Sequence, residues 1–91
     1  PEKRRWGYYV LPILFGDRLV GRIEPHIDRE KTRVEILAVW WEDGFAPGPS
    51  GGAFVEAMRG ALRAYLRFAG ADRIDWAPHL AAEKRLFRAR P

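Results

Sequence analysis

The first half of the chain contains three β-strand patterns, and the connections between them are too short to hold a helix. The first pattern covers 8–15, where apolar residues occupy both faces. Gly16 and Asp17 then suit a two-residue hairpin turn. The second pattern, 18–28, alternates, and the third, 33–41, is rich in β-branched and aromatic residues. The three patterns together predict consecutive antiparallel strands.

Strict alternation assigns a face to each side chain of these strands. It places Val20 on the same face as Arg18 and Arg22. It divides the third strand into two groups, with Val34, Ile36, Ala38 and Trp40 on one side and Leu37, Val39 and Trp41 on the other. The second half of the third strand is then apolar on both faces, so we expect both of its faces to be covered. Pro12 and Pro25 lack a backbone donor, which favours edge positions or bends.

The second half of the chain predicts two helices around one short strand. Residues 42–52 include four Gly and two Pro, a composition typical of a loop. A helix follows over 52–69 and stops at Gly70, which suits the left-handed conformation that ends helices. Residues 73–76 predict a fourth strand, and 78–88 predict a second helix. The order β-β-β-α-β-α predicts an α+β domain whose curved antiparallel, β-barrel-like sheet of about four strands is packed by one long and one C-terminal helix.

The length of 91 residues allows one small domain, covering 1–91, and the 47% apolar residues are enough for a packed core. No apolar run approaches the roughly 20 residues that span a bilayer. No signal peptide pattern follows the basic N-terminus. We therefore expect a cytoplasmic domain without membrane contact. Because the chain starts at Pro1 and ends in a basic helical pattern, we take it to be a piece of a longer protein.

The composition excludes several kinds of catalytic site. The chain has no Cys, so a thiol nucleophile, a disulfide or a thiolate zinc site cannot form. The only serine, Ser50, lies in the Pro/Gly-rich loop. Glu24, His26 and Asp28 alternate along one strand and could hold a metal ion, but this arrangement is more typical of a solvated charged face. We expect no catalytic residue, no metal and no cofactor.

The basic residues are the more informative set, with 13 Arg against 3 Lys. Arg18 and Arg22 share a face of the second strand if the alternation holds, and Arg29, Lys31 and Arg33 cluster at the next connection. A basic β-hairpin can follow a phosphate backbone, so these five residues are predicted to contact DNA. The alternative is a solvated edge whose cations pair with nearby acidic residues, namely Glu24, Asp28, Glu30 and Glu35.

Two further features are more typical of structural roles. The long helix carries a row of arginines, Arg59, Arg63 and Arg67, as solvated helix faces commonly do, and Glu56 is placed to pair with the first of them. Adjacent tryptophans at 40 and 41 must place one ring on each side of the sheet. One ring belongs to the core, and the other packs on a helix or meets a neighbouring domain.

The stretches YYVLPILFGDRLVGRIEP and LAVWWEDGF resemble the C-terminal portion of bacterial winged-helix DNA-binding domain proteins, a family that includes crosslink-repair DNA glycosylases. The resemblance covers about residues 6–76, with matching residues at Tyr8, Tyr9, Leu11, Pro12, Gly16, Asp17, Arg18, Leu19, Gly21, Arg22, Asp28, Trp41 and Glu42. It implies a C-terminal β-barrel-like domain that follows several winged helices, and DNA as a partner.

The resemblance also bears on catalysis. Activity in the glycosylase members depends on a Gln-containing motif near the N-terminus of the longer protein. This chain contains no Gln, so that motif is not in it. We therefore expect no enzymatic activity from this chain alone, while the longer protein is a candidate DNA glycosylase that cleaves N-glycosidic bonds.

Two functions of different classes follow from the sequence. The first is a non-catalytic DNA-binding or scaffolding module whose phosphate contacts come from the five hairpin cations. The second is a structural interaction domain without direct DNA contact. Its apolar face at Leu37, Val39 and Trp41 would dock on the other domains of the longer protein or form a weak homodimer.

Overall fold

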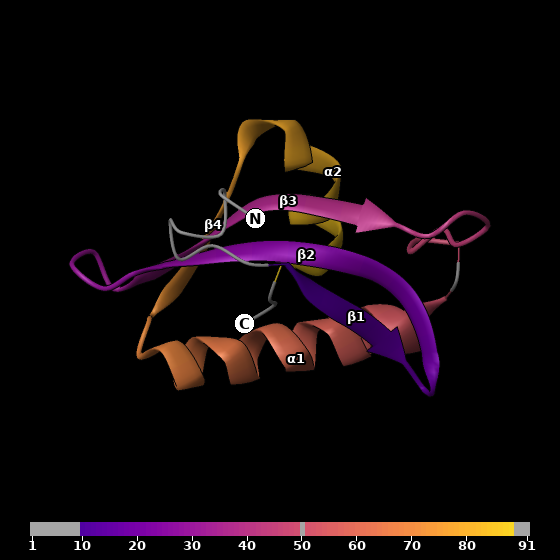
Figure 1. The fold of residues 1–91 in the computed structure, drawn as a ribbon, viewed down its shortest axis with the longest axis horizontal. Helices are drawn as coiled ribbons and strands as arrows, with labels where there is room; N and C mark the ends of the chain where they lie inside the picture. Colours follow the sequence, from indigo (N-terminus) through magenta and orange to yellow (C-terminus); the bar gives the residue numbers. More distant parts are fainter. Residues whose placement is uncertain (1–9, 50, 89–91) are drawn as a thin grey trace.

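The structure is a computed structural model that describes residues 10–49 and 51–88. Its sheet has four strands in the order β1-β2-β3-β4. The elements along the chain are β1 (Leu11–Phe15), β2 (Arg18–Asp28), β3 (Arg33–Trp41), α1 (Gly52–Ala69), β4 (Arg73–Trp76), the short 3₁₀ helix η2 (Pro78–Leu80) and α2 (Ala81–Phe87) (Figure 1). The predicted α+β class, the four strands and the element order are confirmed. Residues 8 and 9 of the first predicted strand lie outside the described residues.

The sheet is open and mixed, whereas the sequence predicts a barrel-like antiparallel sheet. Strands β1, β2 and β3 pair antiparallel, but β4 pairs parallel with β3. The 18 residues of α1 form a connection long enough to return the chain to the same end of the sheet, which a hairpin turn cannot do. Strands β1 and β4 are therefore edge strands on opposite sides, and the sheet does not close.

A β-bulge in β2 changes the face of one residue. Ile13 pairs with Gly21 and Leu14 pairs with Leu19, so Val20 is an extra residue between these two pairs. Val20 lies in the core with 1% of its surface exposed. The prediction that Val20 shares a face with both Arg18 and Arg22 is therefore wrong for Arg22, because the bulge breaks the alternation between Val20 and Arg22.

A second bulge has the same effect in β3. The pairing passes from Pro25–Ile36 to Glu24–Ala38, so Leu37 is the extra residue. The core face of β3 consequently takes two residues before the bulge and two after it: Val34, Ile36, Val39 and Trp41. The predicted grouping is wrong beyond the bulge. Trp40 faces outward and is 47% exposed, so the expectation that both faces of β3 are covered is wrong at this residue.

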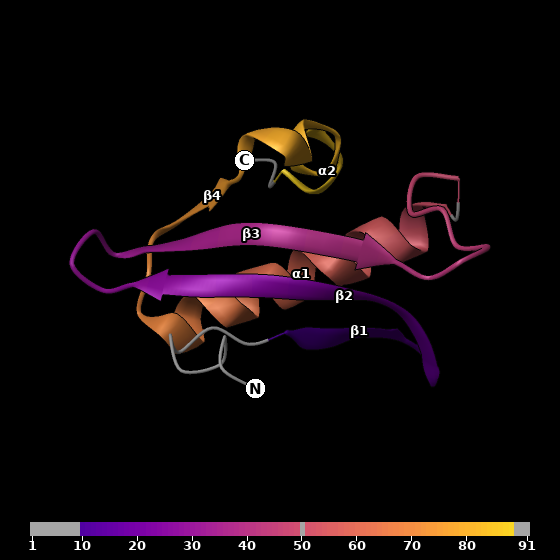
Figure 2. The ribbon, with the colours of Figure 1, turned by 45° about the horizontal axis from the view of Figure 1, so that its top comes forward.

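Both helices pack against the same face of the sheet (Figure 2). Phe54 of α1 is 1% exposed and lies among four other rings. Its ring meets them edge-on, at centroid distances from 5.0 to 6.0 Å, and these rings belong to Phe15, Trp41, Phe45 and Phe87. Helix α1 ends at Gly70 with a φ of 67°, as predicted. None of the described helices is long and apolar enough to cross a membrane.

Gly21 occupies a position where the neighbouring strand leaves no room for a side chain. A Cβ atom there would lie 2.6 Å from the carbonyl oxygen of Trp40 and 2.8 Å from Cε3 of Trp41. We expect Gly21→Ala to lower the free energy of unfolding by about 1–3 kcal/mol, because backbone or core must shift to accept the methyl group. Urea denaturation followed by circular dichroism measures this change.

Gly60→Ala is the matched control, because the same methyl group is added inside α1. There the nearest atom is Nη2 of Arg63 at 3.9 Å. We expect this change to raise the free energy of unfolding by about 0.5–1 kcal/mol through the helix preference of alanine. Equal effects of the two substitutions would contradict the steric argument at Gly21.

Candidate nucleic-acid interface

The bulge in β2 separates two of the five predicted DNA contacts. The guanidinium carbon of Arg18 lies 5.8 Å from the ring centre of Phe45, on the side of the sheet that carries the helices. Arg22 lies on the opposite face, paired with Trp40 across the strands, and its Nη1 donates a hydrogen bond to Glu42 at 2.6 Å. The prediction that these arginines share a face is wrong, so they do not form one basic patch.

Arg33 lies at the centre of an ion-pair cluster on the outward face. Its Nη1 is 2.9 Å from Asp75, its Nε is 3.4 Å from Asp28 and its Nη2 is 3.3 Å from Glu35. The hydrogen bond from Arg33 holds the pKa of Asp75 below its usual 3.8. Hydrogen bonds from the backbone N–H of Lys31 and then from Arg33 lower the pKa of Asp28. Arg33 therefore links three strands, and its charge is neutralised within the sheet.

Arg29 and Lys31 are exposed in the turn between β2 and β3. Their side chains form no ion pair with any carboxylate in residues 10–49 and 51–88. The turn lies beside the start of β4, because the backbone N–H of Asp72 donates to the carbonyl of Thr32 at 2.8 Å. Glu30 occupies the same turn and offsets part of this positive charge.

A second group of basic residues lies elsewhere, around a hollow of about 310 Å³ between α1, β4 and α2. We call it the basic groove. Its basic lining residues are Arg59, Arg63, Arg73, Lys84 and Arg88. The apolar residues that complete the lining are Leu62, Leu66, Ile74, Trp76 and Phe87. Asp72 is the one carboxylate that lines it among the described residues.

Three of these cations, Arg63, Lys84 and Arg88, are exposed and form no ion pair within the described part of the chain. Arg73 shares Asp75 with the strand cluster, at 3.3 Å. Uncompensated charges of one sign that line a hollow with low-dielectric walls raise the local concentration of the opposite ion. The basic groove is therefore a candidate site for an anionic ligand.

Arg59 is less exposed than the other cations and joins the two helices. Its Nη1 pairs with Glu56 at 2.7 Å, as the sequence predicts, and its Nη2 donates to the carbonyl of Leu86 in α2 at 3.2 Å. The side chain is 18% exposed. Both terminal nitrogens are thus engaged within the protein, so Arg59 shapes the groove more than it adds free charge to it.

Sequence reasoning missed the basic groove although a signal for it was present. Residues 10–49 carry five basic and seven acidic side chains, whereas residues 51–88 carry seven basic and four acidic ones. The excess of positive charge therefore belongs to the helical half. Two members of the arginine row, Arg59 and Arg63, line the groove, and Arg67 does not.

The candidate metal ligands on β2 do not come together as a site. Asp28 is engaged with Arg33 in the strand cluster. Among the residues that the structure describes, no group of three His, Cys, Asp or Glu residues could hold a metal ion, and this includes the set with Glu24 and His26. Ser50 lies outside the described residues.

Two of the three residues that the sequence offers as an apolar docking face, Val39 and Trp41, are covered by the chain's own core, whereas Leu37 is the bulge residue and does not belong to it. The Trp41 ring lies 5.9 Å from Phe54 of α1 and 6.0 Å from Phe87 of α2. Its Nε1 also donates to Glu83 of α2 at 3.2 Å. Val39 and Trp41 are therefore not free to bind a partner.

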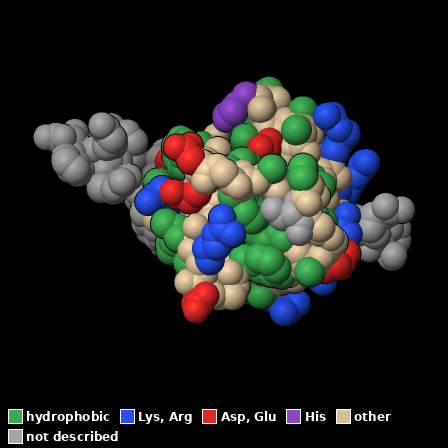
Figure 3. All heavy atoms as spheres, turned by 90° about the vertical axis from the view of Figure 1, so that its right-hand side faces the viewer, with side chains coloured by type: hydrophobic (Ala, Val, Ile, Leu, Met, Phe, Trp, Pro, Cys, Tyr) green, Lys and Arg blue, Asp and Glu red, His purple; other side chains and the backbone are tan. Residues whose placement is uncertain are grey.

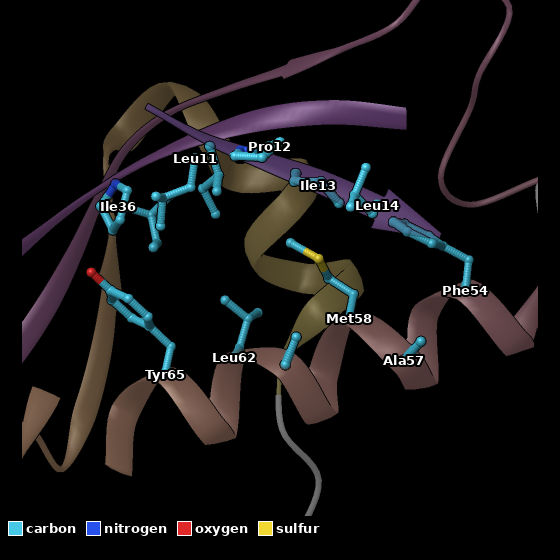
Figure 4. A pocket seen from close by; sticks show the side chains of 13 residues that line it. Leu11, Pro12, Ile13, Leu14, Ile36, Phe54, Ala57, Met58, Leu62 and Tyr65 are labelled. Atoms are coloured by element: carbon cyan, nitrogen blue, oxygen red, sulfur yellow. The ribbon is translucent and has the colours of Figure 1, made fainter. Parts of the chain in front are cut away.

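A different apolar hollow of about 210 Å³ lies between β1 and α1 (Figure 4). Among the described residues that line it, none is charged, and the hydroxyl of Tyr65 is the one polar side-chain group. Leu14 at this site is 61% exposed. Hydrophobic side chains also form a patch, with charged ones around it, at the end of the molecule seen in Figure 3. The hollow suits an apolar group and offers nothing to a phosphate.

Comparisons with known proteins do not place the chain in a family. No protein-family model matches it. No solved structure matches it significantly. The resemblance to winged-helix glycosylases therefore stays a prediction, and the geometry and charge of the site are the evidence on function that the structure provides.

The Arg33 cluster predicts how stability depends on pH. Because the folded pKa values of Asp28 and Asp75 are lowered, the cluster stabilises the fold above about pH 4 and loses this effect as the pH falls through the folded values. We expect Arg33→Met to return the pKa of Asp75 towards 3.8 and to lower stability at neutral pH. NMR titration of the carboxyl carbons and urea denaturation across the acid range measure both effects.

The control for this prediction is Arg22→Met, which removes an exposed ion pair with Glu42. Exposed pairs contribute about 0–1 kcal/mol, so we expect a small loss of stability and no change in the pKa of Asp75. If Arg33→Met left the acid dependence of stability as in the wild type, the assignment of that dependence to the cluster would be wrong.

Proposed function

We propose that this domain is a non-catalytic DNA-binding module that contacts phosphates through the basic groove. One observation carries the proposal: Arg63, Lys84 and Arg88 are exposed, unpaired within the described residues, and line one hollow with a single carboxylate. Contacts between basic side chains and phosphates supply most of the sequence-independent affinity for DNA. The proposal thus keeps DNA as the partner but moves the main contacts from the hairpins to the helices.

The remaining surface supports this placement. On the outward face of the sheet, Arg22 and Arg33 are already paired with carboxylates, and Glu24 adds a further negative charge. A phosphate on that face would meet carboxylates as well as guanidinium groups. Repulsion there and attraction at the groove would together direct a polyanion towards the helical side.

The choice of DNA over another polyanion is supported by the resemblance of YYVLPILFGDRLVGRIEP to winged-helix DNA-binding proteins. In that setting the domain would scaffold DNA beside the other domains of a longer cytoplasmic protein. Any glycosylase chemistry of that protein would come from a Gln-containing segment outside this chain, which has no Gln.

Neutralising two groove cations tests the proposal. We expect Arg63→Ala combined with Lys84→Ala to weaken binding of a labelled DNA oligonucleotide, because two phosphate contacts are lost. The slope of log affinity against log salt should become shallower by roughly 0.7–0.9 for each lost contact. Fluorescence anisotropy across a salt series, with the same oligonucleotide as duplex and as single strand, measures both quantities.

The control removes the same charge from the hairpin turn, as Arg29→Ala combined with Lys31→Ala. We expect a smaller loss of affinity from this pair, because Glu30 already offsets part of the charge there. A larger loss of DNA affinity in the turn variant would show that the main DNA contacts lie on the hairpins and not in the basic groove. If neither form of DNA binds the wild-type chain at low salt, DNA binding is not its function.

A second function is favoured by the apolar hollow between β1 and α1. We propose as the alternative an interaction domain that uses this hollow to dock on the other domains of the longer protein, or to self-associate, without DNA contact. Because Leu14 is 61% exposed there, Leu14→Glu should abolish any concentration-dependent dimer of the 91-residue chain and leave its stability nearly unchanged. Sedimentation velocity measures this, and a strictly monomeric wild-type chain would argue against self-association.

A further inference from the structure

We infer that the basic groove accepts an unpaired nucleotide, with its phosphates on the rim cations and its base against Trp76, so that the domain prefers single-stranded to duplex DNA. This inference rests on the proposed DNA-binding function and adds the form of DNA that the site selects. It is based on the apolar and aromatic residues that line the groove, because phosphate contacts alone would need only the cations.

The floor is apolar and includes aromatic rings. Trp76 is half-buried in the lining, and the ring of Phe87 stacks with it at 6.3 Å between centroids and 21° between planes. A duplex presents its phosphates outward and keeps its bases stacked inside, so it would leave this surface uncovered. The base of a single strand can instead lie against an aromatic surface while basic residues hold the backbone.

The indole of Trp76 carries a hydrogen-bond donor that the contacts between described residues do not use. Its indole N–H donates to no other residue within the described ranges. By contrast, the indole N–H of Trp41 donates to Glu83. A base or sugar oxygen in the groove could accept the hydrogen bond from Trp76.

The position of Trp76 at the edge of the sheet suits a nucleic-acid strand that continues beyond the groove on both sides. It lies on β4, which is an edge strand of the sheet. The rim cations come from different elements, with Arg63 on α1 and Lys84 on α2, so that a bound strand has more than one cation for its phosphates to contact. The volume of about 310 Å³ is at the lower end of the range for ligand sites, which fits one nucleotide better than a base pair.

The experiment compares three labelled probes of one length on the 91-residue chain. They are a single strand, the corresponding duplex, and a sugar-phosphate strand that carries no bases. We expect the wild type to bind the ordinary single strand tighter than either other probe. Trp76→Leu should weaken binding of the ordinary single strand by about five- to a hundredfold, to the level of the base-free strand, because the stacking surface is lost.

The base-free strand is the control for folding. If Trp76→Leu binds it as the wild type does, the variant is folded and its groove cations are in place. Trp76→Phe should restore part of the lost affinity, and Trp40→Leu on the outward face should change none of it.

Two results overturn the inference while DNA binding stands. They are equal or tighter binding of the duplex by the wild type, and an equal loss on both single strands in Trp76→Leu. Failure of all three probes to bind the wild type would instead contradict the proposed function itself.

Discussion

The edge-on packing of rings around Phe54 is the interaction on which the rest of the structure depends. Phe54 contacts rings from β1, β3, the loop before α1, and α2. Each such pair contributes about 0.5–1.5 kcal/mol beyond the burial of its area. The contact with Phe87 matters most for function, because α2 has only seven residues and a helix of that length is not stable alone. One wall of the basic groove is therefore held in place by the aromatic core.

The sequence predicts the order of the elements well, because each is encoded in its own segment. The apolar stripe and Gly70 set the bounds of α1, and β4 lies where its short apolar pattern places it. The sequence predicts less well which face of the sheet each side chain occupies. Successive residues alternate between the two faces, so the prediction depends on an exact count of residues along the strand. One extra residue reverses the face of every position that follows it. Val20 and Leu37 both lie among apolar neighbours, so no polar residue marks the reversal.

The candidate site was harder to predict, because its parts are distant in sequence. Arg33 pairs with Asp75, which lies 42 residues later in the sequence. The neutralisation of the Arg33 charge therefore depends on the parallel pairing of β3 with β4. The groove likewise combines residues from α1, β4 and α2. A regular spacing predicts only that the arginine row shares a helix face. What lies opposite that face, here Lys84 and Arg88 of the α2 segment, follows from packing.

The basic groove contains two features that oppose folding. Within residues 10–49 and 51–88, Arg59 keeps a buried Nε without a partner, and an unsatisfied buried donor costs about 1–3 kcal/mol. The exposed cations of the rim repel one another, and Asp72 alone among the described lining residues offsets them. A bound phosphate would relieve that repulsion only in the folded state, where the cations are held together. The rim cations that repel one another are thus the ones that make anion binding favourable, because a ligand of the native state stabilises it.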